Sequence, residues 1–244
     1  MPLTARAAPR LTLDARRLVH ADSFTAVMLA AAVGAHIERD QGHSVVVQEP
    51  LDDRAWSRLH DAVGTLPGRA RWSGQREPPG RDRDILMPVT RVEDDETADL
   101  LAHWIGVVGA ATRLPASESR LLQQATATFA DNALRHASTR SGLVAACREP
   151  QGNDLQIVCF SPGEDADSRS DANRYVRELA ERSKNELGGL FALDTLARRR
   201  NIDATLRVAT GHARLSSRGQ RFRLDGDAPV VPGFVASLEI HMAP

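Results

Sequence analysis

An amide and an imidazole lie one helical turn apart in the segment TATFADNALRHAS, near the middle of the chain. Apolar residues recur there with a period of about 3.6, so the segment is predicted to be a helix with Asn132, His136 and Phe129 on one stripe. Burying either polar side chain without a partner costs on the order of 1–3 kcal/mol. From the spacing alone, the favoured interpretation is that backbone carbonyls or water molecules form hydrogen bonds with both side chains. The alternative is that the Asn132 amide oxygen faces a ligand or a metal ion.

A glycine pair, Gly188 and Gly189, leads through Leu190 into a second helical pattern that is followed by a strand. Adjacent glycines let the backbone come close to a ligand, and a helix N-terminus offers unpaired N–H groups to a phosphate. A glycine pair before a helix is also a common turn, so this pattern alone does not identify a phosphate site.

Several familiar kinds of site are not indicated. Cys147 and Cys159 are isolated in predicted strands, which favours reduced, buried thiols over a disulfide or a metal site. The histidines are scattered, without a partner at ligand spacing. The chain has neither a P-loop pattern nor the GxSxG pattern of a hydrolase.

The composition is that of a globular protein, with 42% hydrophobic and 26% charged residues. The formal net charge is −1, so no global field draws the protein to nucleic acid, and no nucleic-acid partner is expected. The first ten residues lack the apolar core of a signal peptide, and the longest apolar stretch is too short to span a bilayer. A cytoplasmic location without a membrane span is expected.

The elements that must position these residues fall into two regions. Residues 1–66 contain a predicted strand (10–14), a helix from Ser23, a strand (44–48) and a helix (52–66), which indicates a small α/β unit with a parallel pair of strands. Residues 67–84 are rich in proline, glycine and charge and are predicted to be a linker, cut first by trypsin to leave a stable C-terminal fragment.

Residues 85–244 are predicted to form an α+β domain in which helices cover a sheet. The strands are expected at 85–92, 142–148, 155–160, 204–210, 213–216, 221–225 and 235–242, and the helices at 95–113, 117–137, 174–183 and 189–200. Pro88 places the first of these strands near an edge.

The order of these motifs resembles the GHKL family of ATP-binding domains, which includes histidine kinases and bacterial anti-sigma serine kinases. Residues 131–137 (DNALRHA) resemble its N-box, and residues 187–190 (LGGL) resemble a shortened form of its glycine-rich box. The resemblance implies a GHKL-type α+β sandwich, a mixed sheet with helices on one face, and a possible homodimer. It implies ATP and Mg²⁺ as cofactors, with Asn132 as the magnesium ligand. The nucleotide-binding residues that it implies are Asn132, His136, Gly163, Gly188, Gly189 and Leu190.

The chain departs from that family at positions that carry chemistry. The general base of the anti-sigma kinases is replaced by Thr128, and the aspartate that binds the adenine amino group is replaced by Cys159. The last strand has Phe234 where the family has Gly-Thr. A threonine has no useful basicity and a thiol is a poor acceptor, so phosphoryl transfer is not expected and ATP binding is expected to be weak or lost.

The N-terminal unit resembles STAS-like domains, the fold of anti-sigma-factor antagonists, over the segment LDARRLVHADSF. Asp14 and Asp22 have the spacing of that family, but Phe24 stands at the position of its phosphorylated serine. Helix capping is the role predicted for Asp22 and Ser23.

The two resemblances together indicate a bacterial regulator of the partner-switching kind. The leading hypothesis is a regulator that acts through contacts with a protein of the sigma or anti-sigma type, without catalysis. The alternative is an active GHKL-type serine kinase or ATPase. A third hypothesis is an unrelated enzyme with a pocket formed by Asn132, His136 and Cys159.

Overall fold

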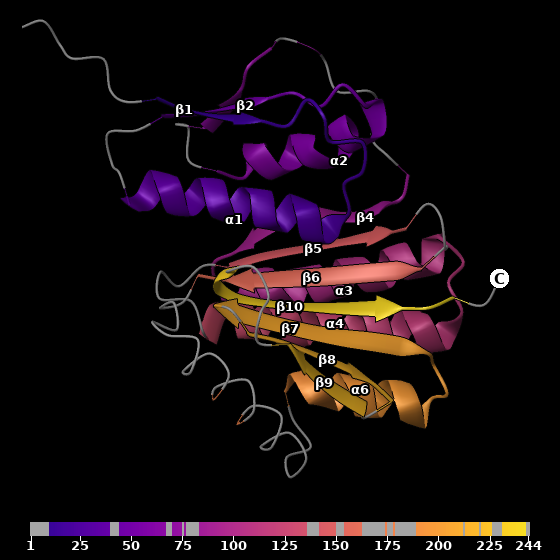
Figure 1. The fold of residues 1–244 in the computed structure, drawn as a ribbon. Helices are drawn as coiled ribbons and strands as arrows, with labels where there is room; N and C mark the ends of the chain where they lie inside the picture. Colours follow the sequence, from indigo (N-terminus) through magenta and orange to yellow (C-terminus); the bar gives the residue numbers. More distant parts are fainter. Residues whose placement is uncertain are drawn as a thin grey trace, which may run out of the picture.

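The computed structural model describes residues 10–39, 44–66, 70–74, 76, 83–135, 142–149, 154–162, 174, 178, 189–211, 213–219, 221–225 and 231–242. The chain has a mixed α/β architecture with two sheets, in agreement with the α+β class indicated by the sequence (Figure 1).

The first sheet belongs to the N-terminal unit and is parallel. Its strands β1 (Arg10–Asp14), β2 (Ser44–Gln48) and β3 (Ala70–Trp72) lie in the order β1-β2-β3. The predicted parallel pairing of the first two strands is confirmed. The third strand pairs with β2 from within residues 67–84, where the sequence predicted only a linker. Its three residues are too few for a periodic pattern to reveal them.

Two capped helices, α1 (Ser23–Arg39) and α2 (Asp53–Gly64), connect these strands. Each begins after an aspartate that satisfies an otherwise unpaired N–H group of the first turn. Asp22 Oδ1 accepts a hydrogen bond from the Thr25 amide at 2.7 Å, and Asp52 Oδ1 accepts one from the Ala55 amide at 2.8 Å. The capping role predicted for Asp22 is confirmed.

The second sheet has the order β4-β5-β6-β10-β7-β8-β9. Its strands are β4 (Ile85–Val92), β5 (Gly142–Arg148), β6 (Leu155–Ser161), β7 (Ala204–Gly211), β8 (Ala213–Arg218), β9 (Arg221–Asp225) and β10 (Val231–Ile240). All of its neighbouring strands pair antiparallel, which corrects the expectation of a mixed sheet. As Pro88 predicted, β4 lies at an edge.

One face of this second sheet, here called the inner face, is covered by α3 (Asp95–Ala111), α4 (Ala116–Arg135) and α6 (Leu190–Arg199). Figure 1 shows α3 and α4 behind the strands. Phe129, Leu122 and Leu193 are among the fully buried side chains of this layer. Of the helix predicted at 174–183, only Arg174 and Glu178 belong to the described residues, and both are helical. None of the described helices is long and apolar enough to cross a membrane.

The outer face of the same sheet is covered in part by the N-terminal unit. Val27 and Ala30 of α1 share one buried cluster with Ala145, Val158 and Val235 of the sheet. Figure 1 shows α1 and α2 between the first sheet and the second. Helices therefore contact both faces of the second sheet, whereas the sequence predicted helices on one face. The difference arises because the second layer comes from the other region of the chain.

Candidate functional site

Asn132 lies in the last turns of α4, where neighbouring residues of the same helix belong to the core. Phe129 and Ala133 are fully buried, while Asn132 is half-buried. Asn132 Nδ2 donates a hydrogen bond to the Thr128 carbonyl at 2.7 Å, one turn back in the same helix. This bond satisfies the amide nitrogen and leaves Oδ1 as the atom that can ligate a cation or accept from a ligand.

The positions around Asn132 carry little acid–base chemistry. Thr128 is half-buried, and its hydroxyl has no useful basicity near neutral pH. Asp131 forms an ion pair with Arg135 at 2.6 Å along the surface of the helix. An ion-paired carboxylate one residue from Asn132 points along the helix rather than replacing the missing base.

Cys159 stands on the inner face of β6 and is fully buried. Burial raises the pKa of its thiol to about 12, so the group stays protonated at neutral pH. A protonated, buried thiol is a poor acceptor for an adenine amino group. The structure thus places an inert core group at the position where the family resemblance implies adenine recognition.

The end of β6 is packed tightly against α4. A Cβ atom at Gly142 would lie 2.5 Å from the Ala133 Cβ and 2.7 Å from the Phe160 carbonyl oxygen. Ser161, also fully buried, donates to the Ala133 carbonyl at 3.4 Å. Protein atoms therefore fill the space between these residues. An adenine ring has no room between Gly142 and Ala133.

Gly189 begins the helix that the sequence associated with a phosphate. It is the N-cap of α6, with φ 80° and ψ −168°, a conformation that L side chains rarely adopt. Within the described residues no side chain caps this helix, and the Ala192 amide donates to the Gly189 carbonyl at 3.0 Å. Leu190 is 4% exposed and packs in the core, so its side chain does not face the solvent.

Helices α4 and α6 pack against each other on the inner face, which brings the Asn132 helix and the Gly189 helix side by side. The other predicted nucleotide residues, His136, Gly163 and Gly188, lie outside the described residues.

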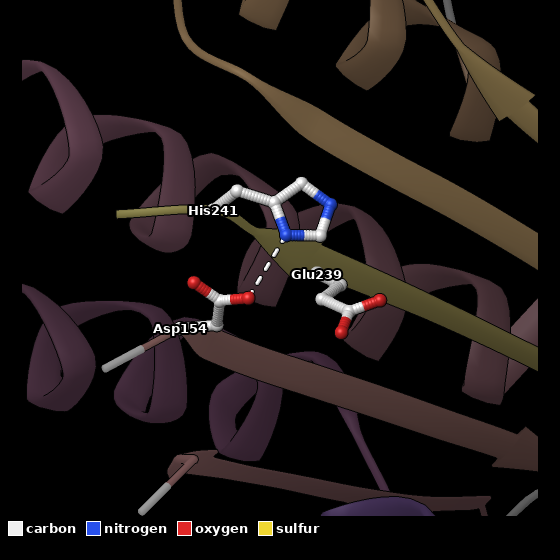
Figure 2. A group of neighbouring side chains, drawn as sticks. All are labelled: Asp154, Glu239 and His241. Carbon is white, nitrogen blue, oxygen red and sulfur yellow. Dashed lines mark hydrogen bonds and ion pairs between the residues drawn. The ribbon is translucent and has the colours of Figure 1, made fainter. Parts of the chain in front are cut away.

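A second group of side chains was not anticipated from the sequence. Asp154, Glu239 and His241 lie within 4.8 Å of one another where β6 and β10 meet the adjoining loops (Figure 2). A histidine and two carboxylates are a common donor set for divalent cations. Glu239 lies near the end of β10 and His241 directly follows that strand, whereas Asp154 precedes β6 and is distant in sequence, so no local pattern joins the three.

The side chains of this group form a network of hydrogen bonds and ion pairs with neighbouring protein groups. His241 Nδ1 lies 2.9 Å from Asp154 Oδ2, and His241 Nε2 lies 3.0 Å from the Thr205 hydroxyl. Asp154 Oδ1 also accepts the Met242 amide at 3.1 Å, and Glu239 forms an ion pair with Arg207 at 2.5 Å. Both ring nitrogens and both carboxylates are engaged by protein groups, so the network ties β6, β7 and β10 together.

Comparisons with protein-family models, with curated proteins and with solved structures gave no match to this chain.

Proposed function

We propose that this protein is a regulator that acts by binding a partner protein, with nucleotide binding weak or lost. The observation that supports this proposal is an exposed apolar stripe on α3. Leu100, Trp104 and Val107 are 63%, 45% and 53% exposed, and they follow one another at helical spacing. Large apolar side chains that gather on one helix face are typical of protein interaction sites.

The charges beside this stripe indicate the character of the partner. Asp95, Glu96 and Asp99 are exposed in the first turns of α3, next to Leu100. A partner surface with apolar side chains flanked by lysine or arginine would complement this acidic end. The partner is therefore a protein with a basic, amphipathic segment, in keeping with the partner-switching kind of regulation.

The groups at the nucleotide position support a non-catalytic role. Loss of a general base typically lowers a rate by about 10²–10⁴-fold. Thr128 stands at that position, and the Cys159 thiol is buried at the position of the adenine contact. Asn132 Oδ1 and the N-terminus of α6 at Gly189 are the groups that would support weak magnesium-dependent ATP binding, and an active kinase or ATPase is the alternative function.

Two measurements test the proposal. The first is recovery of bound proteins from the native cells with a tagged chain, comparing the parent with a Leu100→Ser, Trp104→Ser variant. The control is Val19→Ser, which removes an exposed apolar side chain outside α3. We expect the parent and the control to retain the same partner and the α3 variant to lose it. Equal retention by all three proteins would exclude this surface, and a dimeric mass seen only in the parent and control would identify the partner as a second copy.

The second measurement is turnover of labelled ATP by the parent and by Asn132→Ala. We expect no turnover in either protein. Robust turnover that disappears in the variant would establish the kinase or ATPase alternative instead.

A further inference from the structure

Arginine side chains gather on the part of the outer face that the N-terminal unit leaves open. Ser237, Arg207, Ser216 and Arg223 are directly opposite one another on β10, β7, β8 and β9, and so form one row across four strands. Residues opposite one another share a face, with neighbouring strands about 4.8 Å apart. Arg207, Arg214 and Arg223 are all exposed on this face.

This row lies in a cavity of about 400 Å³. The start of α1 forms one wall through Asp22 and Phe24, and the strands form the floor. Ala209 and Val235 add buried apolar surface to that floor. The volume lies within the range of small-molecule sites, and such sites are common where two units of a protein meet.

The charges within the cavity are predominantly positive. Asp22 is engaged by the Thr25 amide and hydroxyl and by Gln156 Nε2 at 3.2 Å. Arg207 is paired with Glu239. Arg214 and Arg223 also line the cavity. Asp225 stands opposite Arg214 in the pairing of β8 with β9. Guanidinium groups bind carboxylate and phosphate with paired, charge-assisted hydrogen bonds.

We propose that this cavity binds a small organic anion. Its phosphate or carboxylate group lies between Arg214 and Arg223, over the Ser216 hydroxyl, and its apolar part packs against Phe24 and Val235. Because α1 forms one wall, the bound anion bridges the N-terminal unit and the second sheet. This site is independent of the α3 stripe, so either proposal can fail without the other.

The test is isothermal titration calorimetry of the full chain, at low salt, with phenyl phosphate, benzoate and inorganic phosphate. Phenyl phosphate or benzoate is expected to bind one per chain and more tightly than inorganic phosphate, because only the aromatic probes fill the apolar part of the cavity. Arg214→Gln with Arg223→Gln is expected to weaken that binding by at least about tenfold. Arg120→Gln on α4, across the sheet from the cavity, is the charge-matched control and is expected to bind as the parent does.

A second variant, Ser216→Glu, places a carboxylate in the arginine row and is expected to abolish binding while preserving the fold, which thermal unfolding checks. The proposal is overturned if none of the three anions binds saturably at millimolar concentration, or if the arginine and Ser216 variants bind as the parent does. Binding of a polyanion such as heparin without binding of the small anions also overturns it, in favour of a macromolecular partner.

Discussion

The two halves of the outer face of the second sheet differ in what their strands present. Over β5 and β6 the outward residues are Leu143, Ala145, Val158 and Phe160, all of them buried under α1 and α2. Over β8 and β9 the outward residues include Arg214, Ser216 and Arg223, which remain accessible. Both halves belong to one hydrogen-bonded sheet, so the difference lies in the side chains and in what covers them.

This difference shows that the N-terminal unit completes the core of the second sheet. Leu59 of α2 and Val27 of α1 are fully buried in the same cluster as Val158. An apolar sheet face of this kind is stable in water only when another layer covers it. The open half needs no cover because its side chains are polar.

Removal of the N-terminal unit should have the largest effect. A fragment of residues 83–244 leaves Ala145, Val158 and Phe160 without their cover, so we expect it to aggregate and to lose cooperative unfolding. The sequence alone suggested a stable C-terminal fragment, and the shared core reverses that expectation. Size-exclusion chromatography and thermal unfolding measure the outcome, with residues 1–82 supplied separately as the control that restores the cover. A monomeric fragment with a sharp transition would contradict the shared core.

The same negative charge should destabilise the covered half strongly and the open half hardly at all. Val158→Glu buries a carboxylate under α1 and should lower the free energy of unfolding by about 4 kcal/mol or more. Ser216→Glu lies beside Arg207 and Arg223 and should change it by no more than about 0.5 kcal/mol. Urea titration measures both. Similar changes in the free energy of unfolding for the two variants would mean that α1 does not cover Val158.

Arg58 tests the polar contacts between the two units. Its side chain is 3% exposed, donates to the Ala21 and Arg148 carbonyls at 2.9 and 3.0 Å, and lies 3.9 Å from both Asp84 and Glu149. Arg58→Ala removes the donor of both carbonyls and the buried cation beside Glu149, while Asp84 keeps Arg54, and should destabilise by about 3 kcal/mol. The control is Arg54→Ala, whose exposed guanidinium lies 2.8 Å from Asp84 and which should cost less than about 1 kcal/mol. Equal losses of stability in the two variants would mean that the Arg58 side chain is as exposed to solvent as that of Arg54.

The two cysteines should show the smallest effect, as a difference in reactivity. Burial raises the pKa of both thiols from 9.0 to about 12, so neither should react with iodoacetamide in the native protein near pH 8. Cys147 faces Ser23 and Arg58 at the junction of the units, whereas Cys159 lies in the inner core. In mild denaturant Cys147 should therefore be labelled first, as mass spectrometry can show. Simultaneous labelling would mean that the junction opens only with the whole fold.

The same pKa shifts give an alkaline dependence. Above pH 9.0 the unfolded thiols lose protons that the folded thiols keep until about pH 12. The folded state then binds more protons than the unfolded state, so stability should fall as pH rises through this window. Cys159→Ala should reduce that slope, which thermal unfolding across the window would detect.

Local patterns in the sequence predicted most of the elements. The alternation in RLTLD and the β-branched run SVVVQ gave the bounds of β1 and β2, and Pro88 placed β4 at an edge, because these features act within a few residues. The antiparallel order of the second sheet depends on pairing between distant segments, which no local period encodes. The departures at Thr128 and Cys159 were visible as residue types, but the burial of Cys159 required the fold.

The strands themselves carry a sequence signal of which face is covered. Strand β6, LQIVCFS, is buried at every position, while β8, ARLSSR, alternates between buried and accessible. A continuous apolar strand is typical of a sheet covered on both faces, and an alternating strand is typical of one open face. By contrast, the cluster of Asp154 with His241 and the arginine row across β7, β8 and β9 depend on register, and register follows from the assembled sheet.

The position of β10 has a consequence for the order in which the molecule can fold during its synthesis. This strand lies between β6 and β7 and hydrogen-bonds to both, yet it is synthesised after both of them. Until Val231–Ile240 leaves the ribosome, β6 and β7 each have an open edge at the centre of the future sheet, and α1 lacks part of the surface on which it docks. Open strand edges and uncovered apolar faces are the surfaces that chaperones protect. Nascent chains stalled before β10 should therefore be held in an unfinished state, although nearly all of their helices have already been made.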